Sequence, residues 1–381
     1  MSELVLDSVR DLLPGIRERA QRTDEGQTVS SVAVKELNET RLFALLRPRE
    51  FGGIEGELLT CCTAIKDVAQ ACGSTGVLAA AFAVTPWRAA LLPHEAQEEM
   101  WGTAFDTMMS SSVSSSGTIT PSPDGYLVRG RWAGIPGCEH ADWLVVRGAL
   151  AGSGETAVLL APGEYTVISD EPRLGLRGAL SRAVVVDSMV GAHRIRVLGS
   201  GAGIEHLPPS SAPLYRLPAD AVAGAVFASA VIGMAEGAFA EYTMLPRSEP
   251  DSHQLVRFAA AASDIDAAWL LITRNLCDIV AHTIAHEDIP EELLLRTRRD
   301  HHVALARATT ATSVLVESAR GAPSQALNVS NPVTRHWRDI HTARAWLPSG
   351  STAELARYSR AVLEDGGLTP VDHTTQHLEE E

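Results

Sequence analysis

Lysine is nearly absent from this chain of 381 residues, in which it occurs only at Lys35 and Lys66 and arginine supplies the other basic side chains. Acidic residues outnumber basic ones, and the formal net charge is -15 at pH 7. A chain with this charge repels phosphate backbones and anionic lipid surfaces. We therefore expect neither nucleic acid nor a membrane among its partners.

The sequence also lacks the marks of export and of membrane insertion. No uncharged apolar run reaches the length of about 18 residues that a transmembrane helix needs. The N-terminus is acidic and amphipathic, unlike a signal peptide. The five cysteines are odd in number and have no CxxC spacing, which favours reduced thiols over disulfides or a zinc site. We expect a cytoplasmic protein.

The histidines give little indication of a metal site. His282 and His286 are spaced i, i+4 and share a helix face, but the glutamate of an HExxH motif is missing. His301 and His302 are interpreted as a solvated pair. No metal site is predicted.

Helical periodicity dominates the first hundred residues. Apolar residues recur at the spacing of amphipathic helices, and Pro14 is expected to kink or break the first of them. The predicted helices cover residues 4–22, 31–46, 57–72, 77–92 and 95–101.

The pattern changes near Asp106, where short alternating or apolar stretches are separated by turns such as Pro123-Asp124-Gly125. This pattern predicts an antiparallel β-domain. Long helical segments then follow and predict a bundle; they cover residues 219–245, 252–286, 290–320, 332–347 and 352–363. The predicted organisation is a helical domain (1–105), a β-domain (106–217), a helical bundle (218–366) and an acidic tail (367–381).

Three strings in this order resemble the acyl-CoA dehydrogenase superfamily. They are the turn Pro48-Arg49-Glu50-Phe51-Gly52-Gly53, the stretch from Gly175 to Ser181 with the strand after it, and Gly233-Met234-Ala235-Glu236-Gly237. The resemblance spans residues 5–363. It implies an α+β fold with an N-terminal helical domain, a central antiparallel β-barrel-like domain and a C-terminal four-helix bundle, assembled as a tetramer.

Two further strings are similar to the two-component flavin-dependent monooxygenases within this superfamily. Gly130-Arg131-Trp132 followed by Gly137 to Trp143 resembles their strand pair, and Arg335 to His341 resembles their R-x-W-R-D-x-H signature. Such enzymes take reduced FMN or FAD from a separate flavin reductase and oxygenate a small organic substrate. No GxGxxG or Walker string offers another phosphate cradle.

The resemblance implies a set of flavin-binding residues. For the ring they are Ser112, Ser114, Gly117, Thr118, Trp132, Pro136 and Gly137, and Trp337 and Arg338 are counted with them; the alternative for 112–118 is a serine-rich surface hairpin. For the phosphate they are Arg247, Gln254 and Arg257, with a solvated helix face as the alternative.

His341 is the predicted catalytic residue, because a histidine beside a flavin can exchange a proton near neutral pH. Its alternative role is that of a core histidine bonded to a backbone carbonyl. Arg338 and Asp339 are interpreted as a structural ion pair.

Three departures from the monooxygenase pattern define the predicted substrate pocket. Trp346 stands where a second histidine is common, Pro136 replaces a serine, and Thr85-Pro86-Trp87 replaces a string with histidine. We therefore assign Thr85, Trp87 and Trp346 to the pocket. Two alternatives stay open: a flavoenzyme of the same fold that catalyses dehydrogenation, cyclisation or rearrangement, and a non-catalytic binding or assembly protein.

Overall fold

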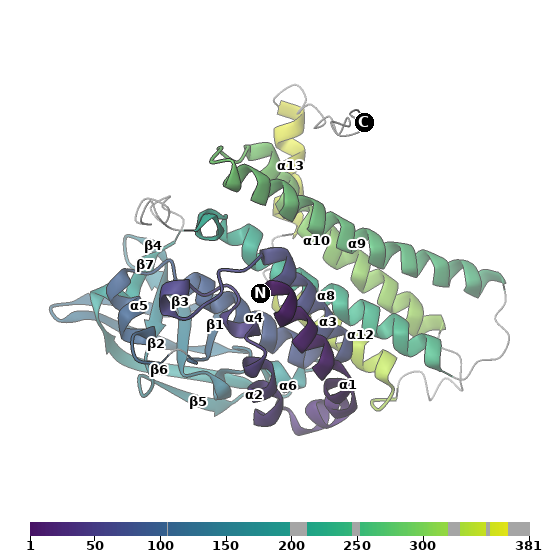
Figure 1. Cartoon of the computed structure of the whole chain (residues 1–381), viewed down its shortest axis with the longest axis horizontal. Helices are drawn as coiled ribbons and strands as arrows, with labels where there is room; N and C mark the ends of the chain where they lie inside the picture. Colours follow the sequence, from purple (N-terminus) through teal and green to yellow (C-terminus); the bar gives the residue numbers. More distant parts are fainter. Residues whose placement is uncertain (105, 199–211, 246–251, 319–327, 348–350, 365–381) are drawn as a thin grey trace.

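The computed structural model describes residues 1–104, 106–198, 212–245, 252–318, 328–347 and 351–364. The N-terminal part is helical and ends before the sheet begins (Figure 1). Its α-helices are α1 (Ser2–Gly26), α2 (Ser31–Glu39), α3 (Leu58–Ala71), α4 (Gly73–Ala89) and α5 (His94–Trp101).

Two details of this region differ from the sequence prediction. Pro14 does not break α1, which is a single helix across it, because Pro14 lies on the exposed face, where water can solvate the carbonyl that loses its partner. The helix predicted over 31–46 ends early. Arg41 adopts a left-handed conformation with φ of 70°, which stops α2 and starts the 3-10 helix η1 (Leu42–Ala44).

The central region forms one seven-stranded sheet with the order β5-β6-β2-β1-β3-β4-β7. Its strands are β1 (Met109–Ser122), β2 (Gly125–Ala133), β3 (Trp143–Leu150), β4 (Gly154–Leu160), β5 (Tyr165–Ser169), β6 (Arg182–Val190) and β7 (Ile195–Val197), with the short helix α6 (Arg177–Leu180) before β6.

The predicted antiparallel pairing holds for every strand pair of this sheet except β1 and β3, which run parallel. The reason is local. Strand β2 returns along β1 and ends beside its start, and the chain then crosses the end of β1 to begin β3, with the Asp142 N–H donating to the Met108 carbonyl. Register shifts between Ser111 and Thr118 mark bulges in β1.

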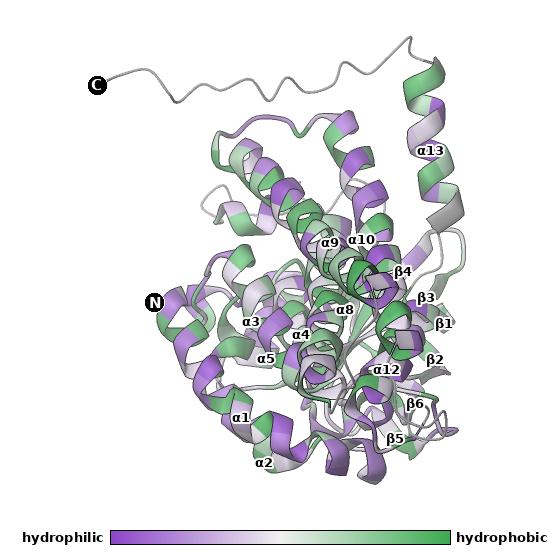
Figure 2. Ribbon diagram, turned by 90° about the vertical axis from the view of Figure 1, so that its right-hand side faces the viewer, coloured by the Kyte–Doolittle hydropathy of each residue, from purple (hydrophilic) through white to green (hydrophobic). Residues whose placement is uncertain are grey.

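The C-terminal helices are α8 (Ala219–Met244), α9 (Ser252–Ile284), α10 (Glu291–Ser318), α12 (Pro332–Trp346) and α13 (Ser351–Glu364). They agree with the predicted segments to within a few residues. Helices α9 and α10 run side by side away from the sheet (Figure 1), and α13 packs against α10, with Arg299 of α10 over the ring of Tyr358. Hydrophilic and hydrophobic residues alternate along α1 and α10, as expected of amphipathic helices (Figure 2).

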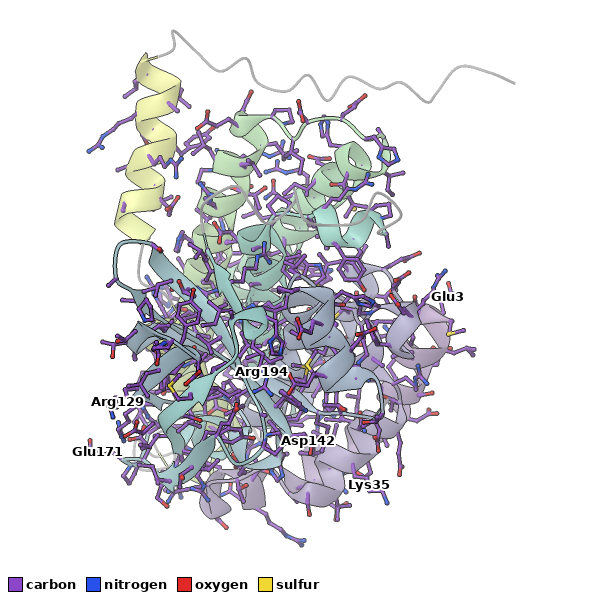
Figure 3. All side chains as sticks on the ribbon, turned by 90° about the vertical axis from the view of Figure 1, so that its left-hand side faces the viewer. Glu3, Lys35, Arg129, Asp142, Glu171 and Arg194 are labelled. Carbon is purple, nitrogen blue, oxygen red and sulfur yellow. The ribbon has the colours of Figure 1, made fainter. Side chains whose placement is uncertain are left out.

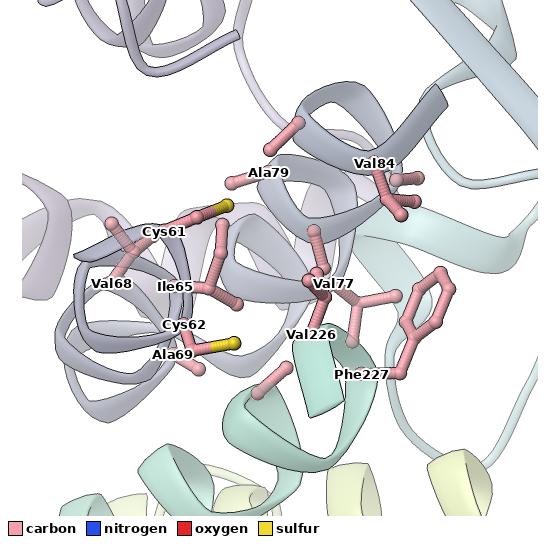
Figure 4. Packing of buried hydrophobic residues seen from close by; sticks show 14 of the residues in the cluster. Cys61, Cys62, Ile65, Val68, Ala69, Val77, Ala79, Val84, Val226 and Phe227 are labelled. Atoms are coloured by element: carbon pink, nitrogen blue, oxygen red, sulfur yellow. The ribbon is translucent and has the colours of Figure 1, made fainter. Parts of the chain in front are cut away.

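The core joins the helical regions and the sheet. Helix α4 contacts β1 on one side and α3 and α8 on others. Cys61, Cys62 and Ile65 of α3 pack against Val77 of α4 and Val226 of α8 (Figure 4). Of the described helices, α8 alone has the length and apolarity to cross a membrane, but 78% of the relevant window is buried inside the protein. Here α8 is the central helix of the core.

Candidate active site

A cavity of about 270 Å³ lies where α4, the sheet, α8 and α10 meet. Its apolar lining comes mainly from Val113, Phe227, Leu305 and Leu347. Its polar lining consists of Arg88, Arg147, Asp220, Arg298, His301, His302 and Glu354. A concave site that combines apolar side chains with converging polar ones is a candidate small-molecule site.

Arg88 is the only charged residue between Gly73 and Pro93, in a helix that is otherwise buried. Its Nη1 donates to the Ser111 hydroxyl at 2.7 Å, and the Thr85 hydroxyl donates to the same oxygen at 2.9 Å. Arg88 keeps some exposed surface because it lines the cavity. Desolvation of its guanidinium, helped by the nearby charge of Arg147, lowers its pKa to about 9.

The opposite wall of the cavity comes from α10 and the start of α8. Arg298 pairs with Asp220 at 3.2 Å. His301 packs directly onto Gly224, where an added Cβ would lie 2.2 Å from its Nδ1. Desolvation lowers the pKa of His301 to about 4 and also lowers the pKa of His302. The interpretation of these histidines as a solvated pair is therefore wrong: both line the cavity.

Trp346 packs behind Phe227, which lines the cavity. Its ring meets Phe227 edge-on, with the ring centroids 5.5 Å apart, and its indole N–H donates to the Gly134 carbonyl at 3.0 Å. It thereby ties the end of α12 to the turn after β2. Gly134 has φ of +63°, a conformation that glycine adopts without strain.

A second hollow, a groove of about 520 Å³, opens next to this turn. It is lined by Arg131, Ala133, Asp170, Glu171, Pro172 and Arg173. Glu171 lies at the edge of the molecule in Figure 3. The Asp170 carboxylate accepts hydrogen bonds from Arg131 at 2.6 Å and from Arg173 at 2.8 Å. Desolvation raises the pKa of Asp170, but these hydrogen bonds outweigh it and the pKa is lowered. Nε of Arg173 is buried and has no hydrogen-bond partner among the described residues.

Trp346 lies near residues of both hollows, although it is in the lining of neither. An added Cβ at Gly134 would lie 3.5 Å from Nε1 of Trp346 and 3.7 Å from Nη2 of Arg173, which lines the groove. The ring of Trp346 also contacts Phe227, which lines the cavity. Trp346 therefore connects the turn beside the groove with the wall of the cavity.

His341 faces elsewhere. Its ring contacts that of Trp337 at a tilt of 50°, with the centroids 4.4 Å apart. Both rings contact the Ser313 hydroxyl of α10, at 3.3 Å from His341 Nε2 and 3.2 Å from Trp337 Nε1. Desolvation lowers the pKa of His341, with a smaller contribution from Arg344. His341 and Trp346 are five residues apart, which turns them to different faces of a helix.

The predicted ion pair between Arg338 and Asp339 is wrong. Arg338 is buried and pairs with Asp24 of α1 at 2.7 Å, and it also donates to the Leu174 carbonyl at 2.9 Å. Asp339 accepts the backbone N–H of Leu176 at 2.6 Å, and burial raises its pKa to about 7. These two side chains hold α12 to α1 and to the loop before α6.

The ring-binding residues predicted on β1 and β2 are divided between core and surface. Trp132 is fully buried, donates to the Arg147 carbonyl at 2.7 Å and packs beneath Gly117. Ser112 is buried, and its hydroxyl accepts the Arg147 N–H at 3.0 Å. Ser114 and Thr118 are exposed. None of these residues lines the cavity or the groove.

The other predicted positions lie in the turn after β2 and in α4. Pro136 accepts the Ser110 hydroxyl at 2.6 Å, and Gly137 has φ of +63° and packs against Leu78. Thr85 and Trp87 are fully buried. Trp87 donates to the Leu214 carbonyl at 2.9 Å, so its indole is part of the core, whereas Thr85 reaches the cavity wall through Ser111.

The predicted phosphate-binding residues are on or near α9. Arg257 pairs with Glu317 of α10, Gln254 is half-buried on the same helix, and Arg247 lies outside the described residues. No group of three metal-ligating side chains is found in the described part of the chain. His282 instead lies 3.1 Å from Glu287.

Helices before and after a central sheet, with a cavity at their junction, define the acyl-CoA dehydrogenase fold class. Models of the "Acyl-CoA dehydrogenase, N-terminal domain" and "C-terminal domain" match residues 2–104 and 225–347.

Three relatives narrow this class. The flavin-dependent monooxygenase oxygenase subunit HsaA of Rhodococcus jostii is 34% identical over 87% of this chain and 91% of its own. The oxygenase component of an FADH2-dependent resorcinol hydroxylase of Rhizobium sp. is 28% identical over 85% of both chains. The crystal structure of the 3-HSA hydroxylase of Rhodococcus sp. RHA1 superposes with a TM-score of 0.88 at 32% identity, over 96% of this chain and 98% of the other. The chain belongs to the family of oxygenase subunits of flavin-dependent monooxygenases.

Sequence reasoning did not find the polar residues of the cavity. One signal was present, since Arg88 is a lone charge in a long apolar helix. Such a residue is either paired or functional. Arg147 gave the same signal, as the lone charge of the apolar strand Trp143–Leu150. Arg298 and His301 carried no comparable signal, because each lies among other polar residues.

Proposed function

We propose that this chain is the oxygenase component of a two-component system that hydroxylates a small aromatic substrate with O₂. A separate reductase would supply reduced FMN or FAD. The observation that carries the proposal is the pair of hollows, one beside the turn after β2 and one between the helices, with Trp346 bonded to that turn and in contact with Phe227 of the cavity wall. The names of its relatives, which include a resorcinol hydroxylase, support an aromatic substrate.

The groove beside Gly134 fits a flavin. Its volume of about 520 Å³ is that of a small-ligand site. The guanidinium groups of Arg131 and Arg173 line the groove and offer N–H donors to ring heteroatoms, and Trp346 lies close by at Gly134. A reduced flavin, when bound, supplies the electrons that activate O₂. Arg131, Arg173 and the backbone of residues 134–137 would hold its ring.

The aromatic substrate would bind in the cavity, with Phe227 and Leu347 against its ring and Arg88 at the far wall. Trp346 would exclude water from the passage between flavin and substrate and fix their separation. We assign His341 a positioning role, because its ring holds α12 against α10 through Ser313 and thereby places Trp346.

We further propose that the protein forms a tetramer in the cytoplasm, as expected from the sequence. Four copies would join through α9, which carries exposed apolar residues, and Gln254, Arg257 and Arg247 would bind the flavin phosphate near that interface. The five cysteines, all free, suit a cytoplasmic protein. In the same proposal the helical domain ends at residue 105, the β-domain at residue 217 and the helical bundle at residue 366.

The test is turnover with a supplied flavin reductase, NADH, FMN or FAD and a panel of phenols under ¹⁸O₂. The proposal predicts a product that carries one ¹⁸O atom, and no product when O₂ is excluded. Turnover that persists without O₂ would instead assign the chain to dehydrogenation or rearrangement. No product from any phenol that binds would contradict the proposal.

A further inference from the structure

The charge of Arg88 lacks a counter-ion. No carboxylate of the described residues lies within ion-pair distance of its guanidinium, which donates to the neutral Ser111 hydroxyl at 2.7 Å; the nearest acidic influences, Asp220 and Glu155, pair with other arginines. Placing a guanidinium in a largely apolar helix without an opposite charge is costly. A nonpolar residue would pack there at lower cost, so the cation is explained by something that it binds.

Arg147 brings a second positive charge to the same wall. It comes from β3, lines the same cavity, and its charge helps desolvation to lower the pKa of Arg88. Its nearest carboxylate is that of Glu155, at 3.6 Å and substantially exposed. Two like charges facing one enclosed space repel each other, and an anion between them removes the repulsion.

The remaining walls of the cavity carry two acidic residues and apolar side chains. Asp220 is already paired with Arg298. Glu354 lies on α13, and its buried Oε2 has no partner among the described residues. Between these groups the lining is apolar, with Val113, Phe227 and Leu305. The cavity therefore suits an apolar body with one anionic end that faces α4 and β3.

We propose that the substrate is an aromatic carboxylic acid whose carboxylate is bound by Arg88 with the help of Arg147. This inference rests on the proposed function only in calling the ligand a substrate. Guanidinium and carboxylate groups are both planar and form paired hydrogen bonds. The aromatic ring would then lie against Phe227, next to Trp346.

Calorimetry of the full-length protein tests this without any turnover. The probes are the 4-hydroxy derivatives of benzoate, phenylacetate and 3-phenylpropanoate, each paired with its primary amide. At least one acid should bind about tenfold or more tightly than its amide, as expected of a charge-assisted bond. Arg88→Met should bring acid and amide to similar affinity, and Arg88→Lys should restore part of the preference.

Arg129→Gln is the matched control, since Arg129 is exposed on β2 in a pair with Asp187 and should leave the preference intact. Glu354→Gln should strengthen acid binding, because it removes a negative charge from the cavity. The proposal is overturned if no acid binds more tightly than its amide, or if the preference survives in a folded Arg88→Met variant. An acid preference in a protein that binds no flavin would sustain this inference while the proposed function fails.

Discussion

Arg338 and Asp24 form a buried ion pair, with side chains only 6% and 5% exposed, that fastens α12 to α1. Arg338→Met leaves the Asp24 carboxylate without its counter-ion. We expect the free energy of unfolding to fall by about 3–5 kcal/mol, as measured by urea denaturation at pH 7. Lys35→Met breaks an exposed pair with Glu39 and should change it by less than about 1 kcal/mol. Equal effects of the two substitutions would contradict this account of Arg338.

His336 is buried between α12 and Gly237 of α8, and neither ring nitrogen has a partner among the described residues. Desolvation, with the charges of Arg335 and Arg17, lowers its pKa to about 3. Between pH 6.5 and 3 the unfolded chain binds this proton and the folded protein does not. The contribution to stability is therefore present above pH 6.5 and is lost as the pH falls.

His336→Leu should consequently lose less stability than the wild type between pH 7 and pH 4.5, as measured by urea denaturation at both pH values. Asp339 acts in the opposite sense, because its pKa is raised to about 7 and the folded state holds its proton over this range. That contribution is common to both proteins and cancels in the comparison. An identical pH dependence of the two proteins would show that His336 is protonated in the folded state.

At the scale of elements, α1 carries a proline in its interior that the fold tolerates on the solvent side. Pro14→Ala restores a backbone hydrogen bond and removes the steric conflict, so it should stabilise the protein by up to about 3 kcal/mol. Thermal unfolding measures the effect. Asp11→Ala, at another exposed site of the same helix, should change stability by about 0.5 kcal/mol or less. A loss of stability in Pro14→Ala would contradict this account of Pro14.

Most helices of this chain could be predicted because each buries one face, and the apolar period of about 3.6 residues records that burial. Where the structure differs from the prediction, the cause is a feature that the apolar period does not record. The left-handed Arg41 ended α2, and the parallel pairing of β1 with β3 depended on where β2 ends. His341 and Trp346 were assigned correctly to one helix, but only the structure shows that they face different neighbours.

At the scale of the whole molecule, the cavity could not be predicted from the sequence, because Arg88, Arg147 and His301 come from three regions of the chain. Periodicity describes one element at a time and does not state which elements meet. The family resemblance predicted the order of the domains and assigned Trp346 to the substrate pocket. It could not supply Arg88, which belonged to none of the motifs that carried the resemblance.

The proposed tetramer gives a prediction at the same scale. Helix α9 exposes Leu255, Val256, Leu270 and Ile284, each more than half exposed in the single chain. Apolar residues grouped along a helix mark an interaction surface. Light scattering should report a tetramer of the 40.6 kDa chain. The Leu270→Glu variant should form a smaller assembly, with a lower measured mass. Leu4→Glu, at an equally exposed leucine of α1, should not. A monomeric wild type would contradict this assembly.

The central claim is that the groove beside Gly134 and Trp346 binds a flavin that arrives reduced. The most direct measurement is an anaerobic titration of the full-length protein with FMN and FAD, oxidised and then reduced, followed by absorbance and calorimetry. The account predicts saturable binding, tighter for the reduced form, which Arg173→Met weakens because it removes a guanidinium that lines the groove. Absence of binding by both flavins in both oxidation states would contradict it.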